Sequence, residues 1–247
     1  MVDTHNYTRR QKLINLGLCV QCGKKNDSKL TRCPKCNSEH SRGVADFRKD
    51  NHEYCKIKDG IRQLKSKEEI IKFYSFGTMQ CKLCDELRLG ALTLDHIDGG
   101  GRKHRQTIGY NDFYAWIRRN RYPSGYQVLC SNHNWKKWIT ATRLKIVSNY
   151  HHDRWQSYAV ALKTKFMNVL GGKCVECNID DIDILTVHHI NNDGKKHRAK
   201  VSSGSGSIRF YRAILKSNDF SGLECRCFSC NDVDQWTSKY QNVNLPG

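Results

Sequence analysis

The sequence contains no apolar run of 18 residues, and its first ten residues lack the apolar core of a secretory signal. These absences predict a protein that stays in a reducing intracellular compartment, such as the cytoplasm or nucleoid of a host cell, and is not secreted. Only 38% of the residues are hydrophobic and the mean hydropathy is −0.71, which argues against one large core. Small modules held together by metal fit better, because small domains bury too little apolar surface to be stable unaided.

Acidic residues are also scarce, since 24 Asp and Glu stand against 42 Lys and Arg, for a formal net charge of +18. Such an excess predicts a polyanionic partner, because lysine and arginine neutralise phosphates and release their counterions. We expect double-stranded DNA, with no membrane and no obligatory protein partner, so that a monomer can act alone. The competing interpretation is a basic surface that only keeps the protein in solution.

The chain holds thirteen cysteines, and nearly all of them lie in or beside closely spaced pairs of metal-binding residues. In a reducing compartment this spacing indicates zinc sites rather than disulfides. A redox Cys-x-x-Cys pair is the alternative, but that chemistry needs one pair on a βαβ unit and not three metal-like sets. Cys225 is expected to be a bystander and Cys55 a free thiol, with a further ligand pair of His52 and Cys55 as the alternative.

The first set is Cys19, Cys22, Cys33 and Cys36, with ten residues between the two pairs. Four thiolates at this spacing can complete a tetrahedral zinc shell. No His/Asp pair lies between them, so a structural role is expected. We predict a zinc-ribbon-like module at 1–50, followed by a basic connector at 51–66.

The two later sets of metal-binding residues belong to an internal repeat. Cys174 lies 93 residues after Cys81, whereas Phe210 lies 97 residues after Phe113. The four extra residues fall within 202–207, a Ser/Gly stretch typical of a surface loop. These constant offsets predict two related modules, at 67–147 and 148–247, which begin with helices near 67–76 and 152–170.

Within the first copy, residues 92–97 alternate between apolar and polar like a half-buried strand. The three glycines at 99–101 permit a sharp exit from that strand and the close approach of a phosphate. Residues 126–130 are expected to form the returning strand. From residue 131 a helix is expected, with a buried stripe formed by Trp135, Trp138, Ile139 and Thr142. The expected order is strand, loop, strand, helix.

This Asp-His-Ile-x-Gly-Gly-Gly line between zinc knuckles resembles the HNH endonucleases, or ββα-metal nucleases, especially the phage and homing types. The resemblance covers about residues 67–147 and 152–240. It implies a small zinc-stabilised α+β fold, with an N-terminal zinc ribbon followed by two tandem ββα modules. It also implies a metal-dependent DNA endonuclease that hydrolyses phosphodiester bonds and leaves 5′-phosphate and 3′-hydroxyl ends.

In the first copy the resemblance implies that His96 is the general base, a role suited to imidazole near neutral pH. Asp95 and Asn134 would hold one Mg²⁺ or Mn²⁺ through hard oxygen atoms. His104 would contact the scissile phosphate, although a plain surface histidine is the alternative. With the N-terminal set there would be three structural zinc sites, the others being Cys81, Cys84, Cys130 and His133, and Cys174, Cys177, Cys227 and Cys230.

The second copy keeps His189 as the base and Asn231 as a metal ligand, but His188 stands where the first copy has Asp95. A His–His pair resembles that of the colicin-type nucleases and can shift the metal preference. Acidic residues directly after Asn231 would repel a phosphate. An inactive second copy is therefore the other interpretation.

Basic side chains near the two motifs are candidates for DNA contact, with a solvated basic face as the alternative for the arginines at 118–121. They are Arg102, Lys103, Arg105, Arg118, Arg119, Arg121, Lys136, Lys137, Lys195, Lys196 and Arg198. Two other functions remain open. One is a non-catalytic, zinc-dependent nucleic-acid-binding protein built from degenerate modules. The other is a nuclease for RNA or branched junctions, since such a site reads a phosphate and not a base.

Overall fold

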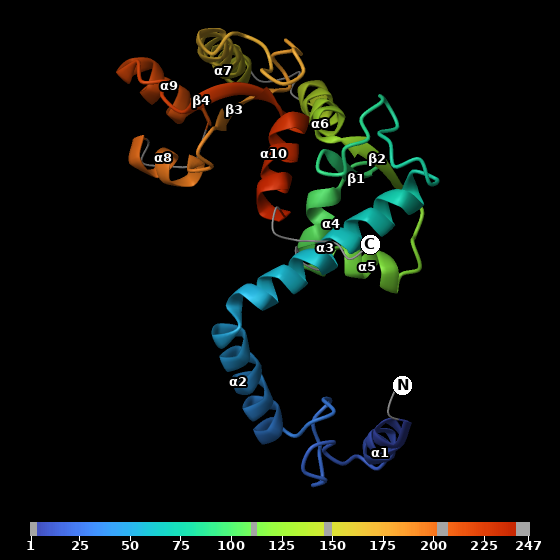
Figure 1. Cartoon of the computed structure of the whole chain (residues 1–247). Helices are drawn as coiled ribbons and strands as arrows, with labels where there is room; N and C mark the ends of the chain where they lie inside the picture. Colours follow the sequence, from blue (N-terminus) through green and yellow to red (C-terminus); the bar gives the residue numbers. More distant parts are fainter. Residues whose placement is uncertain (1–3, 110–112, 146–149, 202–206, 241–247) are drawn as a thin grey trace. The chain divides into compact units, whose positions relative to one another are not determined.

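The computed structural model describes residues 4–109, 113–145, 150–201 and 207–240, and it divides into two compact units, 1–60 and 61–247 (Figure 1). The described residues form ten helices and two separate two-stranded antiparallel sheets, so the protein is α+β as expected. None of the described helices is long and apolar enough to cross a membrane.

The N-terminal part of the chain is helical on both sides of the first cysteine set. It contains α1 (Thr4–Asn15), α2 (Pro34–Asp50) and the beginning of α3 (His52–Tyr74). Proline suits the first turn of α2, because that turn needs no backbone donor there. Among the described residues only an isolated bridge joins Leu18 and Lys25, so the strands of a ribbon are not present. The connector expected at 51–66 lies mostly within α3.

The second unit holds two copies of the same succession of elements. The first copy is β1 (Leu92–His96), α4 (Gly101–Ile108), α5 (Phe113–Arg119), β2 (Tyr126–Cys130) and α6 (Ser131–Lys145). After α7 (Tyr150–Val169), the second copy is β3 (Leu185–His189), α8 (Gly194–Val201), α9 (Ser207–Ser217), β4 (Leu223–Cys227) and α10 (Phe228–Tyr240). Two short helices therefore replace the loop that was expected between the strands of each copy.

Both strand pairs are antiparallel and have the same register. Leu92 faces Cys130 across the first pair, and Leu185 faces Cys227 across the second. The offsets of 93 and 97 residues seen in the sequence thus correspond to equivalent places in the fold. Most of the Ser/Gly insertion at 202–207 lies outside the described residues.

Each copy has a small core of its own. In the first, Leu92 and Leu94 alternate inward from β1 and pack near Ile70 and Ile71 of α3. In the second, α7 and α9 pack with β3 around Phe166 and Phe210. Cores this small need further stabilisation, which metal ions bound by the cysteine-rich groups can supply.

The buried stripe expected on α6 is absent. Trp138 is 56% exposed, and Trp135, Ile139 and Thr142 are only partly buried. Over residues 131–142 of α6, whose burial the structure describes, the buried positions are Ser131 and Asn132, in its first turn. Further along the helix, Trp138 and Thr142 line an open pocket instead of the core.

Candidate active sites and metal centres

Three groups of four metal-binding side chains come together, and within each group the ligand atoms lie within 4.8 Å of one another. Sulfur atoms are 3.8 Å apart for Cys84 and Cys130, and 3.7 Å apart for Cys177 and Cys227. A tetrahedral zinc shell with bonds of about 2.3 Å has sulfur–sulfur edges of about 3.8 Å. The groups can therefore hold three metal ions, and their donors suit zinc. They comprise Cys19, Cys22, Cys33 and Cys36; Cys81, Cys84, Cys130 and His133; and Cys174, Cys177, Cys227 and Cys230.

The Nδ1 atom of His133 supplies the fourth donor of the middle group, 3.2 Å from Cys130 Sγ and 3.6 Å from Cys81 Sγ. Cys55 and Cys225 belong to no metal-binding group among the described residues. Cys225 is buried in the core of the second copy, with its sulfur 3.7 Å from that of Met167.

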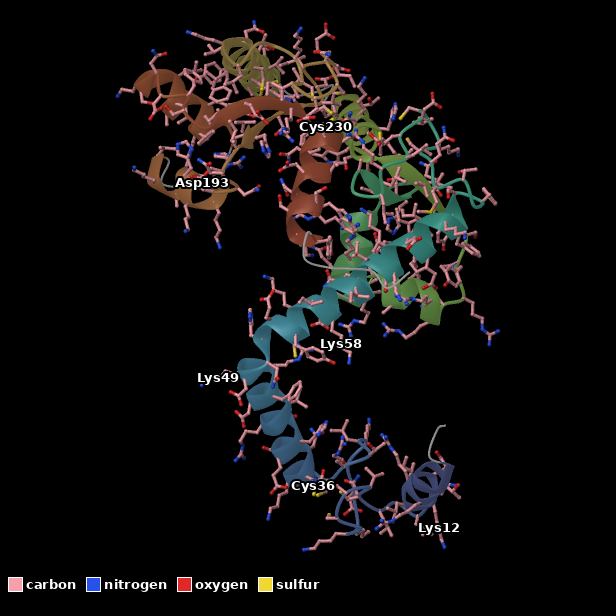
Figure 2. All side chains as sticks on the ribbon, in the orientation of Figure 1. Lys12, Cys36, Lys49, Lys58, Asp193 and Cys230 are labelled. Carbon is pink, nitrogen blue, oxygen red and sulfur yellow. The ribbon has the colours of Figure 1, made fainter. Side chains whose placement is uncertain are left out.

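Each metal-binding group of the repeat spans the end of one strand and the start of the next helix. Cys130 ends β2, and His133 lies in the first turn of α6. In the second copy Cys227 ends β4, and Cys230, labelled in Figure 2, lies in the first turn of α10. A bound ion would fix the direction in which each helix leaves the sheet, and so the position of the asparagine that follows the last ligand.

The structure brings Asp95, His96 and Asn134 together in one pocket of about 690 Å³. Arg102 and Arg105, from the first turns of α4, line the same pocket. The sharp exit from β1 depends on Gly99 and Gly100, which have φ angles of +78° and +80° that disfavour other residues. This turn carries α4 back beside the end of the strand.

Two polar neighbours orient the groups that would bind a cation. Gln127, opposite Asp95 on β2, donates from Nε2 to Asp95 Oδ2 over 2.8 Å. Asn134 donates from Nδ2 to Thr93 Oγ1 over 3.0 Å, which directs its amide oxygen away from Thr93. Thr93 recurs in the second copy as Thr186, a signal that the sequence already contained, whereas nothing in the sequence marked Gln127.

Lys137 lies directly on the candidate cation site. Its ammonium group is 2.5 Å from Asp95 Oδ2 and 2.5 Å from the backbone oxygen of His96. We expected Lys137 to contact DNA, but its position makes it the counterion of the carboxylate. A divalent ion bound by Asp95 would compete with this ammonium for the charge of the carboxylate.

His96 is held from several sides. Its Nε2 lies 2.9 Å from His104 Nδ1, and its ring packs against Phe113 and Tyr126. A Cβ on Gly101 would come within 2.9 Å of His96 Nδ1, so only glycine leaves room for this imidazole. Burial, followed by the nearby His104, lowers the pKa of His96, which keeps the ring neutral near pH 7.

His104 therefore contacts the candidate base, and it does not line the pocket where a phosphate was expected to meet it. Its Nδ1 also lies 3.3 Å from the Tyr126 hydroxyl, and its ring meets Trp116 edge to face. These contacts favour a role in holding His96.

The second copy forms a comparable pocket of about 560 Å³, lined by His188, His189, Asn231, Lys195 and Arg198. A Cβ on the glycine that begins α8 would again lie 2.9 Å from Nδ1 of the candidate base. Burial, followed by the neighbouring His197, lowers the pKa of His189. Its Nε2 is buried without a hydrogen-bond partner, unlike that of His96.

The candidate cation ligands of the second copy contact each other and acidic neighbours. His188 Nδ1 lies 2.9 Å from Asn231 Oδ1, and its Nε2 lies 3.6 Å from Asp234 and 3.9 Å from Glu224. Arg226 pairs with both of these carboxylates. Asp234 occupies the place that Lys137 has in the first copy, so the charge next to the site is reversed.

The other basic residues divide into three groups. Lys103, Lys196, Arg119 and Arg121 are exposed and do not line either pocket. Arg118 is engaged by α3, through Ser66 and Glu69. Lys136 forms an ion pair with Asp181 of the other copy.

No protein-family model matches this chain, and no curated protein or solved structure is significantly similar to it.

Proposed function

We propose that this protein is a metal-dependent DNA endonuclease of the HNH type. The observation that carries the proposal is the gathering of a carboxylate, an imidazole and an amide in one pocket beside two arginines. Three metal-binding groups and a net charge of +18 support it, because they suit a zinc-stabilised protein that binds a polyanion.

In the first copy Asp95 and Asn134 would hold a divalent cation, Mg²⁺ or Mn²⁺, since both offer hard oxygen donors. When bound, the cation supplies positive charge that stabilises the phosphoryl transition state and the leaving oxygen. Arg102 and Arg105 add positive charge along the same pocket, where they can hold the DNA backbone.

His96 would act as the general base, because its lowered pKa leaves the ring free to accept a proton. It takes a proton from water as the water oxygen bonds to phosphorus and the bond to the 3′ oxygen breaks. The 3′ oxygen then takes a proton from solvent. The products carry 5′-phosphate and 3′-hydroxyl ends. His104 acts as a positioning residue that fixes the imidazole.

A supercoiled plasmid incubated with Mg²⁺ or Mn²⁺ tests this function. We expect the wild type to nick or linearise it, and the double variant His96→Ala, His189→Ala to retain its zinc and its DNA binding but lose cleavage. His52→Ala changes an exposed histidine outside both pockets and serves as the matched control. Full cleavage by the double variant would refute the assignment.

A non-catalytic nucleic-acid-binding protein is the second candidate. It is favoured by the second copy, where His188 and Asn231 contact each other and need no cation to satisfy them. That candidate predicts salt-dependent DNA binding without cleavage in any divalent ion. The same assay, repeated with a folded duplex RNA and with a four-way DNA junction in place of the plasmid, tests whether RNA or a branched junction is the substrate.

A further inference from the structure

The two copies meet through residues that correspond in the repeat. Asn132 and Ser229 are 97 residues apart and follow the same cysteine of their knuckles by two positions. The backbone N–H of Asn132 donates to Ser229 Oγ over 3.2 Å, and the backbone N–H of Ser229 donates to Asn132 Oδ1 over 3.0 Å. A twofold axis produces contact of this kind, in which a position meets its own equivalent.

A second pair of contacts follows the same rule. The Ser131 hydroxyl donates to the Asp232 carboxylate, while the Trp135 ring packs on Phe228 with centroids 4.6 Å apart. Phe228 is the equivalent of Ser131, and Asp232 is the equivalent of Trp135. The Ser131–Asp232 contact and the Phe228–Trp135 contact therefore join equivalent positions, with the roles of the two copies exchanged. A head-to-tail arrangement does not generate such reciprocity.

The turn that precedes each first strand, β1 or β3, contacts a helix of the other copy. Arg88 places its guanidinium 3.5 Å from Cys230 Sγ, in the first turn of α10. Asp181, which lies 93 residues after Arg88, pairs with Lys136 on α6. Each copy thus covers the beginning of the other copy's helix. Asn132 and Ser229 are only 8% and 2% exposed, so the centre of this junction is buried, and an open pocket lined by Arg88, Lys136 and Asp181 lies beside it.

The candidate pockets have the same relation to the junction in both copies. Asn134 lines the first pocket and directly precedes Trp135, and Asn231 lines the second and directly precedes Asp232. Successive residues of a helix are about 100° apart around its axis. On both α6 and α10, the face that lines the junction therefore follows the face that lines the pocket in the same direction of rotation. The approximate twofold axis therefore relates the two pockets as well.

We infer that the two copies form an intramolecular twofold pair and that each pocket cuts one strand of the same DNA duplex. The inference rests on the proposed function. In that function the attacking water and the leaving 3′ oxygen lie on opposite sides of phosphorus. The position of the base therefore fixes the side on which the 3′ oxygen lies, and a strand can pass through each site in one 5′-to-3′ direction only. The strands of a duplex are antiparallel and are related by twofold axes. Two sites related by a twofold axis match them, and each cut consumes one water.

A linear duplex with a different label on each strand tests the inference with three proteins. We expect the wild type to cut both strands about one centre, His96→Ala to lose the cut in one strand, and His189→Ala to lose the cut in the other. Loss of the same strand's cut in both variants would overturn the inference. So would a wild-type protein that cuts one strand only, although the proposed nuclease function would then stand.

If the wild type cuts no substrate, the proposed function fails and the pairing is judged by stability. A Cβ on Gly90 would lie 3.0 Å from Trp236 Cβ and from Val233 Cα of the other copy, so Gly90→Val should force the copies apart. We expect its melting temperature to fall by about 5 °C. Gly43→Val, at a helical glycine with nothing nearby, is the control. Equal melting temperatures for the wild type and Gly90→Val would refute the pairing.

Discussion

Lys137 and Asp234 occupy the same place in the two copies and carry opposite charges. The Lys137 ammonium neutralises Asp95, whereas Asp234 faces the His188 imidazole. A cation bound in the first copy would compete with an internal counterion. In the second, it would meet a carboxylate whose negative charge is partly neutralised by Arg226. The two sites should therefore differ in their metal requirement.

Replacing Lys137 with methionine removes the competing ammonium and keeps most of the side-chain volume. We expect the Mn²⁺ concentration for half-maximal cleavage to fall about fivefold, because a partly exposed ion pair contributes about 1 kcal/mol or less. The measurement is a Mn²⁺ titration of nicking in the His189→Ala background, which isolates the first copy. Lys136→Met, whose lysine pairs with Asp181 instead, is the control. An unchanged or higher Mn²⁺ requirement would contradict the competition.

The sequence could predict which residues gather in the pocket but not how their side chains contact one another. Asp95 and His96 were expected to meet at a strand end followed by glycines, and they do so beside Asn134. The contact of Lys137 with Asp95, and of His104 with His96, depends on the rotation of α6 and α4 against the sheet. Local periodicity does not determine such rotations, because each is fixed by packing between elements.

At the scale of elements, the metal-binding groups connect the short strands to the helices that follow them. Each repeat has strands of only five residues, which alone bury little surface. Zinc bound by four thiolate or imidazole ligands contributes about 10 kcal/mol or more to the folding of such modules. The first group lies in a separate compact unit, so its loss should leave the repeat intact.

Cys36→Ser and Cys130→Ser test this division. We expect native mass spectrometry to find three zinc ions in the wild type and two in Cys36→Ser, which should still cleave a short duplex at the wild-type rate. Cys130→Ser, in the His189→Ala background, should lose both its zinc and its cleavage, since Cys130 fixes the start of α6. Three ions in Cys36→Ser, or full activity in Cys130→Ser, would contradict the prediction.

The sequence missed the long helix α2 and the start of α3, where it predicted a ribbon and a connector; within the repeat, the elements that it missed are short or lie at the junction between the copies. Helices α4 and α5 have eight and seven residues, too few for a periodic pattern to separate them from a loop. The apolar stripe of α6 was interpreted as core because its spacing is helical. Part of it instead meets the second copy, as Trp135 does with Phe228, and part lines the pocket.

At the scale of the whole second unit, Lys67 is the clearest case of a residue whose environment depends on both copies. It lies on α3 and is only 7% exposed, with its ammonium 4.1 Å from the centre of the Trp236 ring and 3.3 Å from the Gly90 carbonyl. Burial lowers the pKa of Lys67 to about 8, although Asp232 opposes the shift. The sequence offered no sign of this, because α3 and α10 are far apart along the chain.

The lowered pKa of Lys67 makes the stability of the protein depend on pH in a defined direction. An unfolded lysine titrates near 10.5, so between about pH 8 and 10.5 the folded state binds fewer protons, and stability rises with pH. The free energy of unfolding of the wild type relative to Lys67→Met should therefore increase by about 2 kcal/mol from pH 7.5 to 9.5. Urea unfolding at the two pH values measures this difference. The free energy of unfolding of the wild type relative to Lys65→Met, a change at an exposed position of the same helix, should not differ between the two pH values. If the difference in free energy of unfolding between the wild type and Lys67→Met were the same at both pH values, Lys67 would have to be charged and solvated in the folded protein, and its burial between α3 and α10 would be wrong.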